Sequence, residues 1–136
     1  MSLYLLDTNI ASMVIKDSSP SLKARILSLQ SDDILMISVI TEAELRFGVA
    51  KRGSPKGLSE RVEAFLERVA IMPWTPVISP VYAEMRTSCE AAGVTLGALD
   101  MMIAAHAKSL GATLVSNDGI FRRIPGAFSI ENWHQN

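Results

Sequence analysis

The chain contains a single cysteine, Cys89, among its 136 residues. One cysteine cannot form an internal disulfide bond, so the fold must be stabilised mainly by a hydrophobic core. Cys89 lies in the helix-like segment MRTSCEAAG, and we interpret it as a buried small side chain. With 49% hydrophobic residues, the chain can build one core of ordinary domain size. We therefore expect a single domain over residues 1–136.

Long apolar runs and a targeting segment are also missing. No stretch approaches the ~20 apolar residues that span a bilayer, and no basic leader with a cleavage site is present. We therefore expect a soluble, cytoplasmic protein without a membrane segment. The formal net charge is −1, so the chain has no global basic surface, and any nucleic-acid binding must depend on local patches or on bound metal.

The usual motifs for nucleotide binding and for histidine or cysteine chemistry are scarce. There is no Gly-rich phosphate loop, no repeat and no low-complexity tract. Of the two histidines, His106 is interpreted as a packed helix residue, and His134 belongs to the terminal tail. These gaps leave the acidic residues as the main candidates for chemistry.

Short strand-like segments alternate with longer segments of helical spacing. The expected strands are residues 3–6, 34–37, 70–72, 113–116 and 128–130. Pro20 and Ser79 are expected to start helices, with Ser79 as an N-cap, and Gly93 and Gly111 to end them. Alternating strands and helices require crossover connections, which predicts an α/β fold with a mostly parallel sheet and helices on both faces.

Two of these strands run directly into carboxylates. Asp7 follows LYLL, and Asp118 follows TLVSN. Parallel sheets bind ligands beyond the carboxyl ends of their strands, so the two side chains could meet at one edge. Each residue could equally be a helix N-cap or a turn residue, and the sequence leaves that alternative open.

Glu44 lies in the segment ISVITEAELRFGVAK. On a helix, Ile40, Glu44 and Phe47 fall within about 60° of one another, on the apolar stripe. Glu42 falls on the opposite face, four residues before Arg46, where it can form a surface pair. A carboxylate on a buried stripe is unusual, because burial of an unpaired charge is costly.

Asp100 lies in the almost wholly apolar segment LGALDMMIAAHA. It shares a stripe with Leu96 and Ile103, although an acid in the first turn of a helix is also favourable by itself. Asp7, Glu44, Asp100 and Asp118 would repel one another if they converged, unless a cation lay among them. Carboxylate oxygens without cysteine suit Mg²⁺ or Mn²⁺, and such sites commonly hydrolyse phosphodiesters.

The motifs together resemble those of the PIN-domain ribonucleases, and within them the VapC toxins of bacterial toxin–antitoxin pairs. The segments that carry the resemblance occur in the family's order over nearly the whole chain: YLLDTNI, ISVITEAELRFGV, LDMMIAAHAKSLGATLVSND and IPGAFSIENW. The resemblance implies a PIN-like three-layer α/β/α sandwich with a roughly five-stranded sheet. It also implies a Mg²⁺-dependent endoribonuclease acting on tRNA or another structured RNA.

The family's acidic residues match this chain one by one. Asp7, Asp100 and Asp118 would hold the metal ion, and Glu44 would hold a second ion or orient water. In the segment NDGIF the chain has no additional acid near Phe121, so a ligand there is not expected. Polar neighbours of the site would be Asn9, Ser116 and Asn117. Contacts to RNA phosphates could come from Arg46, Lys51 and Arg52, and the equal alternative is that these three are simply solvated surface residues.

The resemblance also implies partners. Such proteins usually form homodimers and are held inactive by a small antitoxin, whose tail fills a groove lined by the first helices. The apolar stripes of IASMVI and LKARILSL are the candidate docking surface here, and the alternative is that they are simply core.

Three other functions remain to be compared with the ribonuclease hypothesis. A phosphatase with an aspartyl nucleophile usually needs a second Asp two residues later, where this chain has Asn9. A phosphoacceptor receiver domain would explain Asp7 but not Glu44. A non-catalytic PIN-like binding module would not need all four acids.

Overall fold

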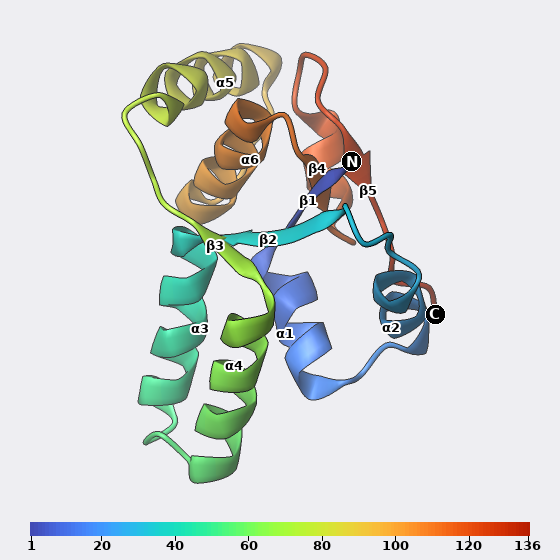
Figure 1. The fold of residues 1–136 in the computed structure, drawn as a ribbon. Helices are drawn as coiled ribbons and strands as arrows, with labels where there is room; N and C mark the ends of the chain where they lie inside the picture. Colours follow the sequence, from blue (N-terminus) through green and yellow to red (C-terminus); the bar gives the residue numbers. More distant parts are fainter.

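The computed structural model describes residues 1–136 and has the expected α/β architecture. Five strands form one sheet in the order β3-β2-β1-β4-β5, and each neighbouring pair is parallel. The elements in chain order are β1 (Leu3–Leu6), α1 (Thr8–Lys16), α2 (Pro20–Leu27), β2 (Ile34–Ser38), α3 (Val39–Lys51), α4 (Lys56–Arg68), β3 (Ala70–Met72), α5 (Ile78–Ala92), α6 (Ala98–Leu110), β4 (Thr113–Val115), the 3₁₀ helix η1 (Gly119–Arg123) and β5 (Ile130–Glu131). Figure 1 shows their arrangement.

The register of the central strand brings the carboxyl ends of three strands together. Leu6 at the end of β1 pairs with Ile37 of β2 on one side and Val115 of β4 on the other. The backbone N–H of Asp7 then donates to the carbonyl of Val115 at 3.0 Å. Asp7 therefore begins at the sheet edge where β2 and β4 also end.

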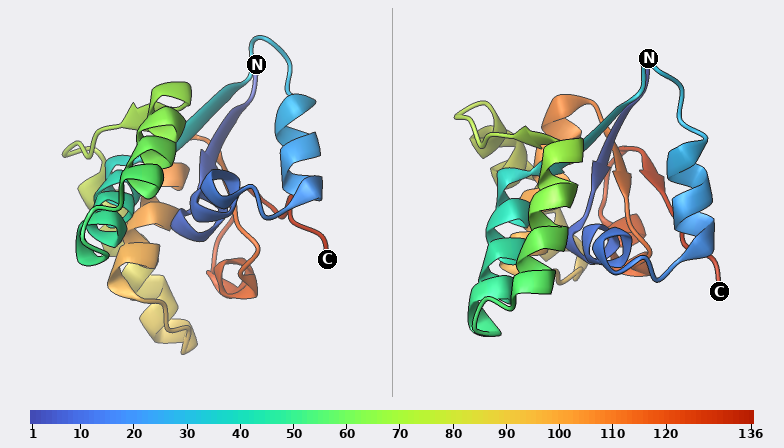
Figure 2. Two further views of the ribbon diagram at one scale, coloured as in Figure 1. Left: turned by 90° about the horizontal axis from the view of Figure 1, so that it is seen from below. Right: turned by 60° about the horizontal axis from the view of Figure 1, so that its bottom comes forward.

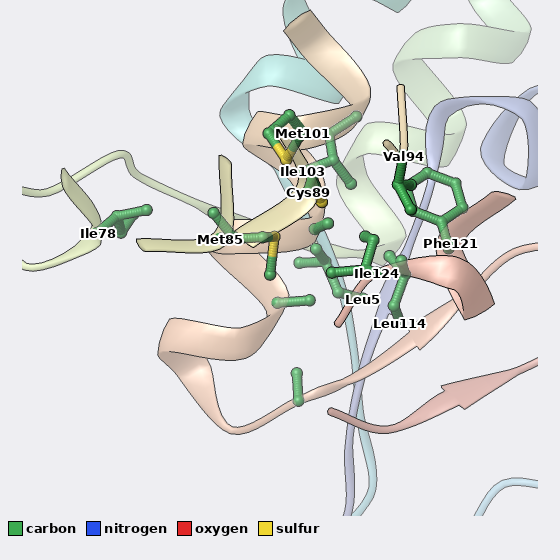
Figure 3. Close-up of a cluster of buried hydrophobic side chains, with 14 of the residues drawn as sticks. Leu5, Ile78, Met85, Cys89, Val94, Met101, Ile103, Leu114, Phe121 and Ile124 are labelled. Carbon is green, nitrogen blue, oxygen red and sulfur yellow. The ribbon is translucent and has the colours of Figure 1, made fainter. Parts of the chain in front are cut away.

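One face of the sheet packs against α5 and α6, which lie above it in Figure 1. Leu5 and Leu114 point to this side, where they meet Met85 and Cys89 of α5 and Ile103 of α6. Figure 3 shows this cluster, with Phe121 and Ile124 closing it next to the strands. Cys89 is fully buried, as the sequence predicted.

The opposite face is covered by α1, α2, α3 and α4. Leu6 and Ile37 point to this side because side chains alternate along a strand. They pack with Ile10 of α1 and Phe65 of α4, and the same cluster includes Leu22 of α2. The result is the expected three-layer sandwich, with α3 and α4 extending beyond the sheet as a long hairpin (Figure 2).

Several details differ from the expectations. β2 ends at Ser38 rather than at residue 37, and β4 ends at Val115 rather than at residue 116. The fifth strand is Ile130–Glu131 rather than residues 128–130. Ser79 is not an N-cap, because α5 already starts at Ile78, where a backbone turn lets Ile78 N–H donate to the Thr75 carbonyl at 3.0 Å. Phe47 is 65% exposed, because the buried face of α3 carries Thr41 and Leu45, and a spacing of two residues turns Phe47 about 200° away from Leu45. The expected glycine stops are confirmed, with φ of 70° at Gly93 and 64° at Gly111.

The C-terminal tail packs against α2 and holds it. The Arg25 guanidinium lies 4.7 Å from the centre of the Trp133 ring, and it also pairs with the Glu131 carboxylate at 3.7 Å. Ser19 Oγ lies 2.7 Å from His134 Nδ1, and the backbone N–H of Gln135 donates to Ser21 Oγ at 2.8 Å. Figure 1 shows the C-terminus beside α2, away from the other helices.

None of the helices combines the length and the apolar character that crossing a membrane would require.

Candidate active site

Asp7 is held at the junction between β1 and α1. Its carboxylate Oδ1 accepts the backbone N–H of Ile10 at 2.8 Å and so caps α1. The residue is 4% exposed. Asp7 can therefore be both the N-cap of α1 and a candidate site residue, because the capping hydrogen bond fixes its carboxylate at the edge of the sheet.

Asp118 lies at the corresponding end of β4 and caps η1. Its Oδ1 accepts the backbone N–H of Ile120 at 3.0 Å, and its own N–H donates to Ser116 Oγ at 3.0 Å. The next side chain of η1 to enter the core is Phe121, which is 1% exposed. This buried ring anchors the short helix that carries Asp118.

Asp100 and Glu44 reach the same region from helices on opposite faces of the sheet. Asp100 lies in the first turn of α6, which begins after Gly97, and its carboxylate is partly buried. Glu44 lies in the second turn of α3, where its Oε1 accepts a hydrogen bond from Thr8 Oγ1 at 2.7 Å. Glu42 points elsewhere and pairs with Arg46 at 3.1 Å, as predicted.

The helical stripe proposed for Glu44 needs a correction. The buried face of α3 is centred on Thr41 and Leu45, and Glu44 lies beside it. Phe47 does not share the interior, and Lys51 Nζ lies 5.9 Å from the centre of its ring. Glu44 is thus partly exposed at the mouth of the site rather than buried in a stripe.

Two of the carboxyl groups have perturbed acidities. Burial raises the pKa of Asp7, hydrogen bonds with Ser116 and Ile10 oppose that rise, and the charges of Asp100 and Asp118 add to it. Burial also raises the pKa of Asp100, with further contributions from the charges of Glu44 and Asp118. Asp7 is therefore within electrostatic reach of Asp100 and Asp118, and Asp100 is within reach of Glu44 and Asp118.

The donor chemistry of these residues fits a hard divalent ion. No three His, Cys, Asp or Glu side chains are gathered tightly enough to form a ready-made metal cage. Mg²⁺ does not need such a cage, because it binds through one or two carboxylates and keeps several water ligands. Oxygen donors without cysteine or histidine argue against zinc.

Polar side chains connect the segments that carry the acids. Asn9 Nδ2 donates to Asn117 Oδ1 at 2.9 Å, which ties the start of α1 to the end of β4. The sequence reasoning named Asn9, Ser116 and Asn117 but missed Thr8 and Thr41, whose hydroxyl oxygens are 3.1 Å apart. The available signals were that Thr8 directly follows Asp7 and that Thr41 precedes Glu44 by almost one helical turn.

The histidines have the structural roles expected of them. His106 is fully buried, its Nδ1 lies 2.8 Å from Ser38 Oγ, and its ring packs edge-on against Trp74. Burial lowers the pKa of His106, which favours the neutral ring at neutral pH. Since Ser38 caps α3, this contact joins α6 to the start of the helix that carries Glu44.

Among the basic residues suggested for RNA phosphates, Arg46 is already engaged. Its guanidinium pairs with Glu42 at 3.1 Å and with Glu63 at 2.6 Å. These hydrogen bonds raise the pKa of Arg46. Binding a phosphate would require breaking them, so this residue is a poor candidate for that role.

Comparison with known proteins identifies the family. The PIN domain family matches residues 4–127. The chain is 35% identical to Ribonuclease VapC2 of Rickettsia felis, over 96% of this chain and 98% of that protein. It is 30% identical to the tRNA(fMet)-specific endonuclease VapC of Shigella flexneri, over 96% and 97% of the two chains.

Solved structures agree with this assignment. A chain in the crystal structure of VapBC2 from Rickettsia felis bound to a promoter DNA fragment matches with a TM-score of 0.90 and 34% identity, covering 96% of this chain and 98% of that one. A chain in DNA-bound VapBC from Salmonella typhimurium matches with a TM-score of 0.88 and 32% identity, covering 98% and 99%. This chain therefore belongs to the PIN domain family and, within it, to the VapC proteins.

Proposed function

We propose that this protein is a metal-dependent endoribonuclease and the toxin of a VapBC-type toxin–antitoxin pair. The main support is that the charges of Asp100 and Asp118 act on Asp7 and those of Glu44 and Asp118 act on Asp100, which places the four acids in one electrostatic neighbourhood. Relatives of 30–35% identity carry the names ribonuclease and tRNA(fMet)-specific endonuclease. A structured RNA such as tRNA is accordingly the substrate class that we propose, and the cytoplasm is where such substrates are found.

Mg²⁺, with Mn²⁺ as a substitute, would supply an activated water and neutralise charge on the phosphodiester. Asp7, Asp100 and Asp118 would hold the ion, and Glu44 would hold a second ion or orient the attacking water. Raised pKa values at Asp7 and Asp100 agree with carboxylates that a cation would stabilise in the ionised form. The remaining polar groups, Asn9, Ser116 and Asn117, would keep the acid-bearing segments in register.

Contacts to the RNA backbone are proposed for Arg122 and Arg123. Both lie exposed on η1, directly after the segment capped by Asp118. Neither forms an ion pair within the chain, in contrast to Arg46. A chain of net charge −1 needs such free local cations to bind a polyanion.

The groove between α1 and α2 is proposed as the docking site of the antitoxin. It has a volume of about 300 Å³, with Met13 and Val14 on one side and Ile26 and Leu27 on the other. Ile10 and Ala11 from the first stripe are buried core residues instead, and Leu22 from the second is buried while it also lines the floor of the groove. Each stripe thus divides between core and open groove, and the VapBC complexes among the structural neighbours support a partner of this kind.

A homodimer is proposed as well, from the family's usual assembly. Light scattering at micromolar concentration should give about twice the chain mass of 14.8 kDa. A mass equal to that of one chain would contradict this part of the proposal.

The central experiment is an RNA cleavage assay with two matched variants. The wild-type protein should cleave tRNA with Mg²⁺ or Mn²⁺ and lose all activity in excess EDTA. Glu44→Gln should abolish cleavage, whereas Glu42→Gln, two residues away on the Arg46 side, should retain it. Undiminished cleavage in EDTA would overturn the metal mechanism, and consumption of an acyl phosphate in place of RNA would favour a phosphatase.

A further inference from the structure

A chain of hydrogen bonds leads from a buried threonine to the carboxylate of Glu44. Thr8 Oγ1 donates to Glu44 Oε1 at 2.7 Å, and Thr8 Oγ1 lies 3.1 Å from Thr41 Oγ1. Thr41 is fully buried, whereas Thr8 and Glu44 are both partly buried. The chain joins the start of α1 to α3, which are 33 and 36 residues apart in these two pairs.

The direction of both bonds follows from the acceptor at the end. A hydroxyl group has one proton, and Thr8 gives its proton to the carboxylate. Thr8 can then only accept from Thr41, so the Thr41 hydroxyl must be the donor in the second bond. The order is Thr41 to Thr8 to Glu44, with the proton position on each hydroxyl fixed by the next group.

We propose that Thr8 and Thr41 are positioning residues that hold Glu44 in its working orientation. This inference rests on the proposed function, in which Glu44 takes part in phosphodiester hydrolysis. A glutamate has several rotatable bonds, and a partly exposed one would otherwise sample many orientations. A charge-assisted bond of 2.7 Å restricts that freedom before substrate arrives, which lowers the cost of reaching the reactive geometry.

The location of Thr8 makes the restraint more effective. Thr8 directly follows Asp7, whose carboxylate is fixed by the cap of α1. The hydrogen bond from Thr8 therefore holds the Glu44 side chain against the same short segment that positions Asp7, although Glu44 belongs to α3. Thr41, which is one turn before Glu44 on α3, fixes the hydroxyl that reaches across between the two helices.

Removal of single hydroxyl groups tests the order of the chain. Thr8→Val keeps the shape of the side chain and removes the donor to Glu44, and Thr8→Ser restores a hydroxyl. We expect Thr8→Val to lower kcat for RNA cleavage by about 10- to 100-fold, the range found when groups that orient active-site ligands are removed. Thr8→Ser should recover most of that loss, and KM for RNA should stay near the wild-type value in both variants.

Thr41→Val should lower kcat by less than Thr8→Val does, because Thr8 can still donate to Glu44. In the Thr8→Val background the same change should have almost no further effect, since Thr41 acts through Thr8. Thermal unfolding of each variant checks that it is folded. If Thr41→Val does not fold, Thr41→Ser and the Thr8 pair still carry the test.

Binding of Mn²⁺, measured by electron paramagnetic resonance without RNA, gives a second readout. Thr8→Val should weaken Mn²⁺ binding relative to both wild type and Thr8→Ser. If the wild type does not cleave RNA, the proposed function fails, and this titration alone decides the positioning role. Wild-type kcat together with wild-type Mn²⁺ binding in Thr8→Val would overturn the inference, as would full additivity of the two valine substitutions.

Discussion

The Asp7 side chain combines a helix cap with a buried charge, and two substitutions can separate these effects. Asp7→Asn keeps an oxygen that can accept the Ile10 N–H and removes the charge. Asp7→Ala removes both the charge and the cap. The difference between the two variants therefore isolates the cap, and the difference between Asp7→Asn and the wild type isolates the charge.

The cap is expected to contribute about 1 kcal/mol, the typical loss when a capping Asp or Asn becomes Ala. Asp7→Ala should therefore unfold at a temperature roughly 4 °C below Asp7→Asn, for a domain of this size. The charge acts in the opposite direction. Burial raises the pKa of Asp7 in the folded protein above its ordinary value of 3.8, so ionisation at neutral pH reduces folding stability.

The sign of the pH dependence follows from this raised pKa. The wild type retains the stability associated with protonated Asp7 at pH values below 3.8 and loses it as the pH rises through the folded-state pKa. Asp7→Asn should consequently be more stable than the wild type at pH 7 without metal, and this advantage should shrink as the pH approaches 4. Both variants should be inactive on RNA.

Urea unfolding at several pH values in EDTA measures these differences. Glu67→Gln serves as the control, because Glu67 is an exposed acid on α4, and its neutralisation should change stability by less than about 0.5 kcal/mol. The reasoning would be refuted if Asp7→Asn were less stable than the wild type at pH 7. Equal stability of the Asn and Ala variants would show that the cap contributes nothing.

Three further outcomes are expected. Phe121→Ala should destabilise the fold by about 3–5 kcal/mol, because the ring is fully buried and anchors η1; chemical denaturation measures this, and a loss below about 1 kcal/mol would contradict the anchoring role. Glu42→Gln should cost only a few tenths of a kcal/mol in thermal unfolding, the scale of an exposed helix pair, and a loss of several kcal/mol would show that its pairing with Arg46 is structural. Mg²⁺ at ten times its Kd should stabilise the wild type by about 1.4 kcal/mol but leave Asp7→Asn nearly unchanged, whereas an equal rise in both would place the ion elsewhere.

Much of the sheet could be predicted because its strands are short apolar segments bounded by turn and helix signals. Leu3–Leu6 and Ala70–Met72 have the expected bounds. The predicted bounds of the last strand were wrong because the strand has only two residues, Ile130–Glu131, and its limits depend on pairing with β4 rather than on its own sequence. The pattern of apolar residues predicts which segments are buried, but it does not predict how two neighbouring strands align with each other.

Helix signals were reliable where they act locally. Gly93 and Gly111 end helices because their backbone adopts a positive φ there. Ser79 failed as a start signal because the preceding turn, through the Thr75 carbonyl, already supplies a hydrogen bond for the first turn. The interior position expected for Phe47 was wrong because the core contacts of α3 are centred on Thr41 and Leu45, with Val49 further along the helix, and periodicity alone had placed the apolar stripe on another face.

The candidate site illustrates the same limit. Asp7, Asp100 and Asp118 could be proposed from their positions at strand and helix ends, which topology then brings to one edge. Thr8 and Thr41 were missed, because the hydrogen bonds of Thr8 to Thr41 and Glu44 join segments more than 30 residues apart, and adjacency to Asp7 and Glu44 in the sequence does not by itself reveal them. Hydrogen-bond partners that come from distant segments of the chain do not produce a periodic pattern in the sequence.

The packing of the C-terminal tail has a practical consequence for handling the protein. Anything fused after Asn136 would emerge beside Ser19 and Ser21, at the start of α2, and Ser19 itself lines the groove between α1 and α2. A purification tag or fluorescent label at this end would therefore lie close to the groove and could disturb measurements of antitoxin binding. The amino end lies at a different edge, where Ser2 N–H donates to Asp33 at 3.1 Å, and is the better attachment point for tags and immobilisation.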